Sequence, residues 1–315
     1  MSAVTAPQAD RAAPARTASD DLDVVPLRHW GRWVAALLVG LVAASFLLSL
    51  ARNPNLDWTT VGTYLTKDFV IRGVGITLLL TALAMVIGTV GGVLVAVMRL
   101  SANPVLSWSA WLFVWFFRGT PLLVQIIFWG FLAALYERIQ IGVPFTGWHL
   151  VDLDTNAVVT PIVAAVLALG LNEMAYAAEI VRGGILSVED GQDDAATALG
   201  LTRAQTMRTI VLPQAMRVIV PPMGNETITM LKSTALVSVI GGRDLLTAVQ
   251  SVYAQNFKVI PLLVVAAMWY LALTSVLSLG QYFLERRFGR GRRGSAGPGV
   301  ISRWFKVSAA EGVAR

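Results

Sequence analysis

Several polar and charged residues lie inside or beside apolar stretches of this sequence, where a small solute could bind them. They are Asn172, Tyr176, Glu179, Asn225, Glu226 and Lys232. The first three are separated by four and three residues, so they share one face of a helix. Charged groups within apolar segments are costly and usually face a cavity or a partner. The pattern predicts side chains that line a solute pathway and contact an ammonium or carboxylate group.

A purely structural interpretation of the same residues stays open. Glu226 and Lys232 could pair with each other and lock helices together. Glu179 and Arg182 are spaced three apart, which also suits a structural ion pair at the membrane edge. We weigh the pathway above this alternative, because the segment with Glu226 also carries Pro221 and Pro222. Prolines that break a helix there would expose backbone groups as further ligands.

Enzymatic chemistry finds little support. The chain has no cysteine, and its two histidines, His29 and His149, lie far apart, so no metal site is predicted. No HExxH helix or Ser/His pair is present. None of the four lysines follows a glycine, as a phosphate-binding P-loop requires. We therefore expect neither a cofactor nor an enzyme, and any ATP must be hydrolysed by another chain.

The composition indicates a membrane protein. Hydrophobic residues make up 56% of the 315 residues, charged residues only 14%, and the mean hydropathy is +0.65. Soluble domains average about 45–50% apolar and about 25% charged residues. The net charge of +6 comes mostly from arginines. In a membrane chain such an excess sets orientation, so we expect a lipid bilayer as partner and no nucleic acid.

Charge-free runs predict the membrane spans, since about 20 apolar residues cross the bilayer as a helix. Five runs of 18 to 26 residues qualify: Trp33–Ala51, Gly73–Met98, Gly119–Tyr136, Thr155–Asn172 and Val259–Leu284. A sixth, Arg217–Gly242, contains the double proline and is predicted to be a broken helix. Residues 1–32 look like a disordered tail, and residues 33–51 like a retained helix, although a cleaved signal peptide is the alternative.

Six spans with a cytoplasmic amino end would place 18 Arg and Lys residues inside and 6 outside. This asymmetry predicts that both termini are cytoplasmic. Arg118, Thr120 and Pro121 are predicted to form a structural rim at that side, with Thr120 capping a helix that Pro121 begins. We expect a lipid phosphate or a carboxylate to hold Arg118. Residues 103–117 should form an interfacial helix, and Gly88, Gly91 and Gly92 should allow close helix packing.

The predicted cytoplasmic segment 187–214 reads as a rigid elbow of two short helices. The first runs from Gln192 to Leu199 with acidic residues in its first turn, and Gly200 ends it. Thr202 and Gln205 fit a capping box that starts the second, and Pro213 marks its end. Small residues such as Ala195 would let a partner approach closely. An amphipathic elbow on the membrane surface is the alternative.

At this elbow the sequence resembles the permease subunits of ATP-binding-cassette (ABC) importers. Their EAA loop reads E-A-A-x3-G-x9-I-x-L-P, and this chain matches it at Asp194, Ala195, Ala196, Gly200, Ile210, Leu212 and Pro213, with Asp in place of Glu. The shorter Asp side chain puts in doubt any salt bridge that the Glu would make. RGTPLLVQ at 118–125 and AYxxExxRGGI at 175–185 are similar to the polar amino acid uptake branch. LPQA at 212–215 and LKxTxL at 231–236 add to this, and the resemblance covers residues 72–287.

The resemblance implies an all-α integral membrane protein with six transmembrane helices, a five-helix permease core and one extra amino-terminal helix. A transport domain over residues 72–287 would be followed by a basic tail, 288–315. It implies an importer of a polar or charged amino acid in the cytoplasmic membrane. The expected partners are ABC ATPase subunits that receive the elbow, an extracytoplasmic solute-binding protein, and a second permease copy in a homo- or heterodimer.

A secondary carrier driven by an ion gradient, using Glu226 and Lys232, is the alternative function. Such a carrier would have no use for a capped docking elbow, and the elbow therefore favours the importer.

Overall fold

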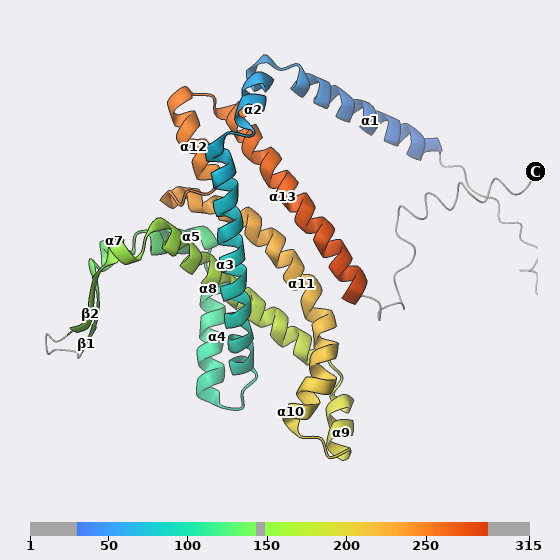
Figure 1. Ribbon diagram of the computed structural model, residues 1–315. Coiled ribbons are helices and arrows are strands. Elements are labelled where there is room, and N and C mark those ends of the chain that lie inside the picture. Colours follow the sequence, from blue (N-terminus) through green and yellow to red (C-terminus); the bar gives the residue numbers. More distant parts are fainter. Residues whose placement is uncertain (1–29, 143–148, 289–315) are drawn as a thin grey trace, which may run out of the picture. The chain divides into compact units, whose positions relative to one another are not determined.

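The computed structural model describes residues 30–142 and 149–288, which are almost entirely helical (Figure 1). The chain divides into two compact units, residues 1–54 and 55–315. The first unit contributes α1 (Trp30–Ala51), a helix of 22 residues with no buried side chain. It starts three residues before the predicted Trp33. The expectations for residues 1–29 and 289–315 lie outside the described residues.

The second unit contains the remaining helices. They are α2 (Trp58–Tyr64), α3 (Asp68–Arg99), α4 (Pro104–Gly119), α5 (Leu122–Gly130), α6 (Leu132–Leu135), α7 (Thr155–Val158), α8 (Pro161–Leu186), α9 (Asp190–Ala198), α10 (Arg203–Thr206), α11 (Leu212–Ser233), α12 (Leu245–Asn256) and α13 (Val259–Phe288). A π-helical turn (Met207–Val211) joins α10 to α11, a 3₁₀ helix (Thr234–Ile240) follows α11, and a 3₁₀ turn (Pro54–Leu56) precedes α2.

Four helices of the described chain, α1, α3, α8 and α13, are each long and apolar enough to cross a membrane. Two bent pairs raise the possible number to six: α4 with α5, which meet at 99°, and the helix Arg203–Ile240 with α12, which meet at 43°. The predicted span Gly119–Tyr136 is wrong as one helix, because α5 has only nine residues and reaches about 13 Å. The span predicted at Thr155–Asn172 is shifted, since α8 begins at Pro161.

The predicted break at the double proline is also wrong. Pro221 and Pro222 lie inside α11, which continues to Ser233. The chain leaves helical geometry later, at Gly241, where φ is +70°. Asp244 then starts α12 by accepting hydrogen bonds from the backbone N–H groups of Leu246 at 2.9 Å and Thr247 at 3.3 Å.

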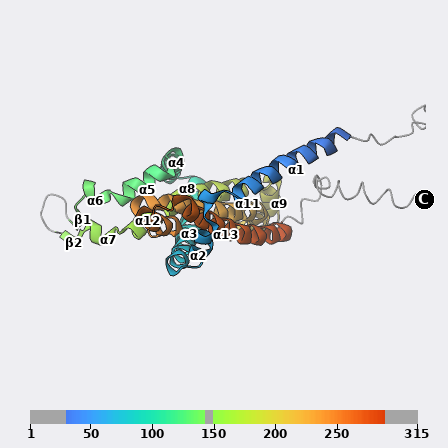
Figure 2. The ribbon, with the colours of Figure 1, turned by 90° about the horizontal axis from the view of Figure 1, so that it is seen from above.

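A β-hairpin corrects the all-α expectation. Strand β1 (Arg138–Gly142) pairs antiparallel with β2 (His149–Asp154). Arg138 Nε donates to Asp152 Oδ1 at 2.7 Å across the hairpin, and this hydrogen bond lowers the pKa of Asp152. Seen from above, the hairpin lies at the far end of the second unit from α9 (Figure 2).

Helices α3 and α8 pack closely because of the predicted glycines. A Cβ on Gly88 would lie 2.2 Å from Glu173 Cγ, and one on Gly92 would lie 2.6 Å from Ala177 Cβ. A Cβ on Gly91 would meet Met174 Cε at 2.2 Å. The prediction that these glycines allow close packing is confirmed.

Helix α4 confirms the helix expected at residues 103–117. Its buried residues Ala110 and Val114 join a core cluster with residues of α3, α8 and α11. Trp108 and Trp115 are exposed on the same helix. Helix α4 therefore packs against the core through one face, and its place at the membrane interface stays a prediction.

Candidate functional site

The three predicted residues of α8 share one side of the helix and meet α3 and α4. Asn172 is buried, and its Nδ2 donates to the Phe117 carbonyl oxygen at 3.1 Å and to Gln125 Oε1 at 3.3 Å. Gln125 Nε2 donates to the carbonyl oxygens of Phe117 at 2.9 Å and Thr120 at 3.2 Å. The two amides thus hold the 99° bend between α4 and α5.

The bend corrects the expected role of Thr120. Its hydroxyl donates to the Phe116 carbonyl oxygen at 2.9 Å and accepts from Gln125 Nε2 at 2.9 Å. Thr120 therefore ends α4, and α5 begins at Leu122 after Pro121 with no side-chain cap. The prediction that Thr120 caps the following helix is therefore wrong, and the contacts of Gln125 and Asn172 set the direction of α5.

Arg118 contacts an aromatic ring, whereas the sequence analysis predicted that a lipid phosphate or a carboxylate would hold it. The Arg118 guanidinium carbon lies 5.1 Å from the centroid of the Tyr176 ring, within cation–π range. Among the ion pairs of residues 30–142 and 149–288, Arg118 takes part in none. The sequence placed Arg118 and Tyr176 in separate groups, rim and pathway, and the structure brings them together.

Glu179 is bound by two arginines. Arg182 Nη2 lies 2.8 Å from Glu179 Oε2, and Arg99 Nε of α3 lies 3.7 Å from Glu179 Oε1. The Glu179 side chain is 19% exposed. The expected i,i+3 pair with Arg182 is therefore present, and Arg99 is an additional partner that local sequence spacing could not reveal.

Glu173 is an acidic residue that sequence reasoning did not select. It is 1% exposed, and its Oε1 has no hydrogen-bond partner within the described residues. The side chain lies in the space that Gly88 leaves open. The sequence signal that could have identified Glu173 is a charged residue between Asn172 and Tyr176 within an apolar helix.

The predicted residues of α11 occupy different environments. Glu226 is half-buried and lies within electrostatic range of Glu173 and Arg118, whereas Asn225 and Lys232 are exposed. In the described part of the chain, Glu226 and Lys232 do not form an ion pair. Lys232 follows Glu226 by six positions, so their side chains lie on different faces of α11. The Glu–Lys lock that we weighed as an alternative is therefore not formed.

The elbow has the two predicted helices, with small shifts. Helix α9 begins at Asp190, so Asp190 and Asp193 occupy its first turn and Asp194 does not. Gly200 ends it with φ +76°, and its N–H donates to the Thr197 carbonyl oxygen at 3.0 Å. The N–H of Leu201 donates to the Ala196 carbonyl oxygen at 3.0 Å, which completes a Schellman motif.

The capping box at the start of α10 is confirmed. Gln205 Oε1 accepts from the Thr202 backbone N–H at 2.8 Å, and Thr202 Oγ1 accepts from the Gln205 N–H at 3.4 Å. Ala195 and Asp194 are exposed and open to a partner, whereas Ala196 is fully buried. Among the residues matched to the EAA loop, Ala196 is therefore not accessible to a partner.

Pro213 does not end the second elbow helix. Helix α10 continues through the π-helical turn Met207–Val211 into α11, where Pro213 occupies the first turn. The wider π-helical turn directly before Pro213 accommodates the missing N–H donor, so the helix continues past the proline. The second elbow helix and Glu226 consequently lie on one continuous helical segment, Arg203–Ile240.

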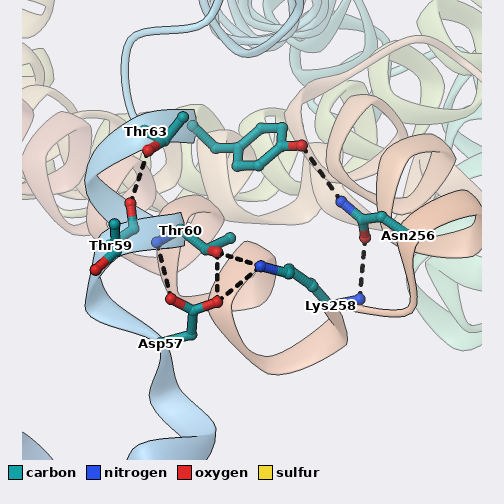
Figure 3. A network of polar contacts seen from close by, with 7 residues as sticks. Asp57, Thr59, Thr60, Thr63, Asn256 and Lys258 are labelled. Carbon is teal, nitrogen blue, oxygen red and sulfur yellow. Dashed lines mark hydrogen bonds and ion pairs between the residues drawn. The ribbon is translucent and has the colours of Figure 1, made fainter.

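At the end of the second unit opposite the elbow, a polar network joins the turn before α2 to the turn before α13 (Figures 1 and 3). Lys258 Nζ lies 2.8 Å from Asp57 Oδ2 and donates to Thr60 Oγ1 at 2.8 Å. The hydrogen bond from Lys258, followed by those from Thr60, lowers the pKa of Asp57 to about 2. Asp57 precedes α2 and Lys258 precedes α13, so this pair joins the turns before these two helices.

Comparison with known proteins decides the family. Residues 88–290 match the family described as binding-protein-dependent transport system inner membrane component. The chain belongs to this family. The resemblance to ABC importer permeases that the motifs indicated is thereby confirmed.

The curated relatives of this permease carry the names of amino acid transport proteins. It is 45% identical to the arginine transport system permease protein ArgU of Corynebacterium glutamicum over 271 residues, which cover 86% of this chain and 84% of the relative. It is 34% identical to the glutamine transport system permease protein GlnP of Escherichia coli K12, over 73% of this chain and 97% of the relative.

A crystal structure of an amino acid ABC transporter with histidines is also similar. That chain is 34% identical to this permease, with a TM-score of 0.60 over 70% of this chain and 94% of its own length. The shared core supports the importer over the ion-coupled carrier.

Proposed function

We propose that this chain is the membrane-spanning permease subunit of an ABC importer for amino acids, coupled through its elbow to a separate ATPase. One observation carries the coupling: the second elbow helix, α10, and the pathway residue Glu226 share the continuous helical segment Arg203–Ile240. A force applied at α10 would move Glu226 without passing through a flexible joint. The transport domain is residues 72–287, and the protein resides in the cytoplasmic membrane.

The partners follow from the family. We infer two ATPase subunits beneath the elbows, an extracytoplasmic solute-binding protein that delivers the solute, and a second permease copy. Family membership and the exposed residues Asp194 and Ala195 support the ATPase contact. The elbow would then mark the cytoplasmic end of the second unit, and the turns with Asp57 and Lys258 the outer end (Figure 1).

The charges near the middle of α8 favour a basic amino acid as solute. Glu179 is already bound by Arg182 and Arg99. Near Tyr176, the acidic groups Glu173 and Glu226 and the basic group Arg118 take part in no ion pair of the described residues. Lys232 is also unpaired there, but it lies on another face of α11 from Glu226. Arg118 suits the α-carboxylate of the solute, and the two acids suit its α-ammonium and a cationic side chain. The arginine relative from Corynebacterium supports this choice.

Transport by the reconstituted complex tests the proposal. The permease, its ATPase and the solute-binding protein in vesicles should accumulate labelled arginine when ATP is supplied. Gly200→Pro should abolish uptake, because proline cannot adopt a φ of +76°. Gly191→Ala, in the same elbow with free space around it, is the matched control and should transport normally. Accumulation by the permease alone under a proton or sodium gradient would refute the importer.

The solute preference has a separate test. Arginine, lysine, glutamine and glutamate should compete for uptake with arginine and lysine as the strongest competitors. Glu226→Gln and Glu173→Gln should each weaken competition by lysine more than by glutamine, because only lysine uses both acids. If glutamate or glutamine competes as well as arginine in the unaltered transporter, the basic solute is wrong while the importer stands.

A further inference from the structure

The end of α8 that leads into the elbow packs directly against the start of α11 (Figure 1). Gly184 of α8 is buried, and a Cβ on it would lie 2.3 Å from Ile219 Cγ1 and 3.3 Å from the Ala215 carbonyl oxygen. Ile219 is 6% exposed, and Ala215 is fully buried. The Ile219 side chain therefore occupies the space that the missing Cβ of Gly184 leaves. Gly184 belongs to the motif at 175–185, and the pathway residues do not account for it.

The elbow is joined to α11 and to α8 in different ways. Helix α10 continues through the π-helical turn into α11 without a break. Helix α8 ends at Leu186, and residues 187–189 link it to α9 outside helical geometry, with Glu189 in an extended conformation. A second non-helical link, residues 199–202, separates α9 from α10. The backbone therefore passes a movement of α10 directly to α11, whereas the backbone route from α10 to α8 crosses two non-helical links.

We propose that Gly184 is a positioning residue through which α11 moves α8 during transport. This inference rests on the proposed function, in which the elbow receives force from an ATPase. Close-packed protein interiors have low compressibility and transmit strain. Because Ile219 lies directly against the Gly184 backbone, a shift of α11 carries α8 with it. Tyr176 of α8 and Glu226 of α11 then keep their spacing while the transporter changes conformation.

The residues around this contact favour joint movement of the two helices over their separation. Ala215 and Ile219 of α11 belong to one buried cluster with Ala178 and Val181 of α8. Ala178, like Ala215, is fully buried. Glycine and alanine have no side-chain rotamers to exchange, so little between the two backbones can yield when one helix is displaced. A displacement of α11 at this level is therefore passed to α8 through packing.

A reversible cross-link tests joint movement. The chain contains no cysteine, so Gly184→Cys together with Ile219→Cys introduces a single pair across the contact. A disulfide needs Cβ atoms about 3.5–4.5 Å apart, and the close approach of Gly184 to the Ile219 side chain is compatible with this spacing. In the complete transporter in vesicles, the oxidised pair should import labelled arginine with ATP as fast as the same protein after reduction. The unaltered complex, oxidised and reduced in the same way, is the control.

Two results of the cross-link would overturn the inference. Uptake that stops on oxidation and returns on reduction would mean that α8 and α11 must separate at Gly184 during transport. A cysteine pair that does not oxidise would mean that the two helices do not keep this contact. Either result leaves the proposed function standing, because the unaltered complex still imports. If the unaltered complex accumulates no amino acid with ATP, the proposed function fails together with this inference.

Changes of side-chain size test the same contact without a covalent bond. Gly184→Ala displaces Ile219 and should raise the number of ATP molecules hydrolysed per solute about five-fold, the lower end of a typical coupling between two sites. Adding Ile219→Ala removes the colliding atoms and should restore this ratio. Gly73→Ala is the matched control, because its methyl group would lie 2.9 Å from Leu245 Cα of α12. It should lower Tm as Gly184→Ala does and leave the ratio unchanged. A ratio that Gly184→Ala does not alter, or that Gly73→Ala raises equally, would overturn the inference.

Discussion

The side-chain amide of Asn172 in α8 donates to Gln125 Oε1 in α5 at 3.3 Å, and both amides donate to the Phe117 carbonyl oxygen. Asn172 thus connects the buried face of α8 with the 99° bend between α4 and α5. A bend of this size leaves carbonyl groups of α4 without helical partners, and Gln125 supplies donors for them.

Removal of the Gln125 amide should therefore destabilise the protein. Gln125→Leu leaves buried polar groups without partners, which costs about 1–3 kcal/mol of unfolding free energy. Thermal unfolding in nanodiscs measures the loss. Combined with Asn172→Leu, the change should cost less than the sum of the two, with a coupling energy of about 0.5–3 kcal/mol. Ser109→Ala, at an exposed site, should stay within about 0.5 kcal/mol. Strict additivity of the pair would contradict the coupling.

Close packing of α3 on α8 predicts opposite effects for two glycines of the same helix. Gly88→Ala puts a methyl group 2.2 Å from Glu173 Cγ, and overpacking of this kind costs about 1–3 kcal/mol. Gly75→Ala has nothing within 4 Å and should stabilise α3 by about 0.5–1 kcal/mol. The two Tm values should lie on opposite sides of the unaltered protein. Equal values would mean that α3 and α8 separate easily.

The elbow predicts a similar contrast in coupling. Gly200→Ala strains a left-handed residue by about 1 kcal/mol, so the elbow should be more mobile and ATP hydrolysis less tightly linked to uptake. Thr202→Val removes one half of the capping box, at a cost of about 0.5–2 kcal/mol, and should act in the same direction. The number of ATP molecules hydrolysed per solute taken up measures the effect. Gly191→Ala should leave this ratio unchanged. A ratio that neither Gly200→Ala nor Thr202→Val alters would exclude a coupling role for elbow rigidity.

The Asp57–Lys258 pair predicts a pH dependence of stability. The folded pKa of Asp57, about 2, lies below the ordinary 3.8, so the folded state favours the charged carboxylate. This contribution is complete above about pH 5 and is lost as the pH falls through about 2. Lys258→Met removes the main cause of the low pKa, and its stability should fall less steeply between pH 4 and 2. Chemical unfolding at several pH values provides the measurement. Parallel curves for both proteins would show that the pair has no net effect.

Most of the local structure followed from the sequence. The apolar runs identified α1, α3 and α13, because a helix is the structure that satisfies its own backbone in lipid. Gly200, Thr202 and Gln205 predicted the elbow correctly, since their effects act within a few residues and need no partner from elsewhere. The EAA loop and the motifs at 118–125, 175–185 and 231–236 together identified the family without any tertiary contact.

The tertiary structure decided where helices bend and which charges meet. Proline was expected to break α11 at Pro221 and to end α10 at Pro213, yet the helix continues through both, and neighbouring contacts instead bend the chain after Thr120 and Gly241. Arg118 on Tyr176 and Arg99 near Glu179 join residues over 50 positions apart. Sequence spacing shows only which side chains share a face of one helix. Which of these side chains share a site depends on how α3, α4, α8 and α11 pack, and the glycines of α3 set that distance.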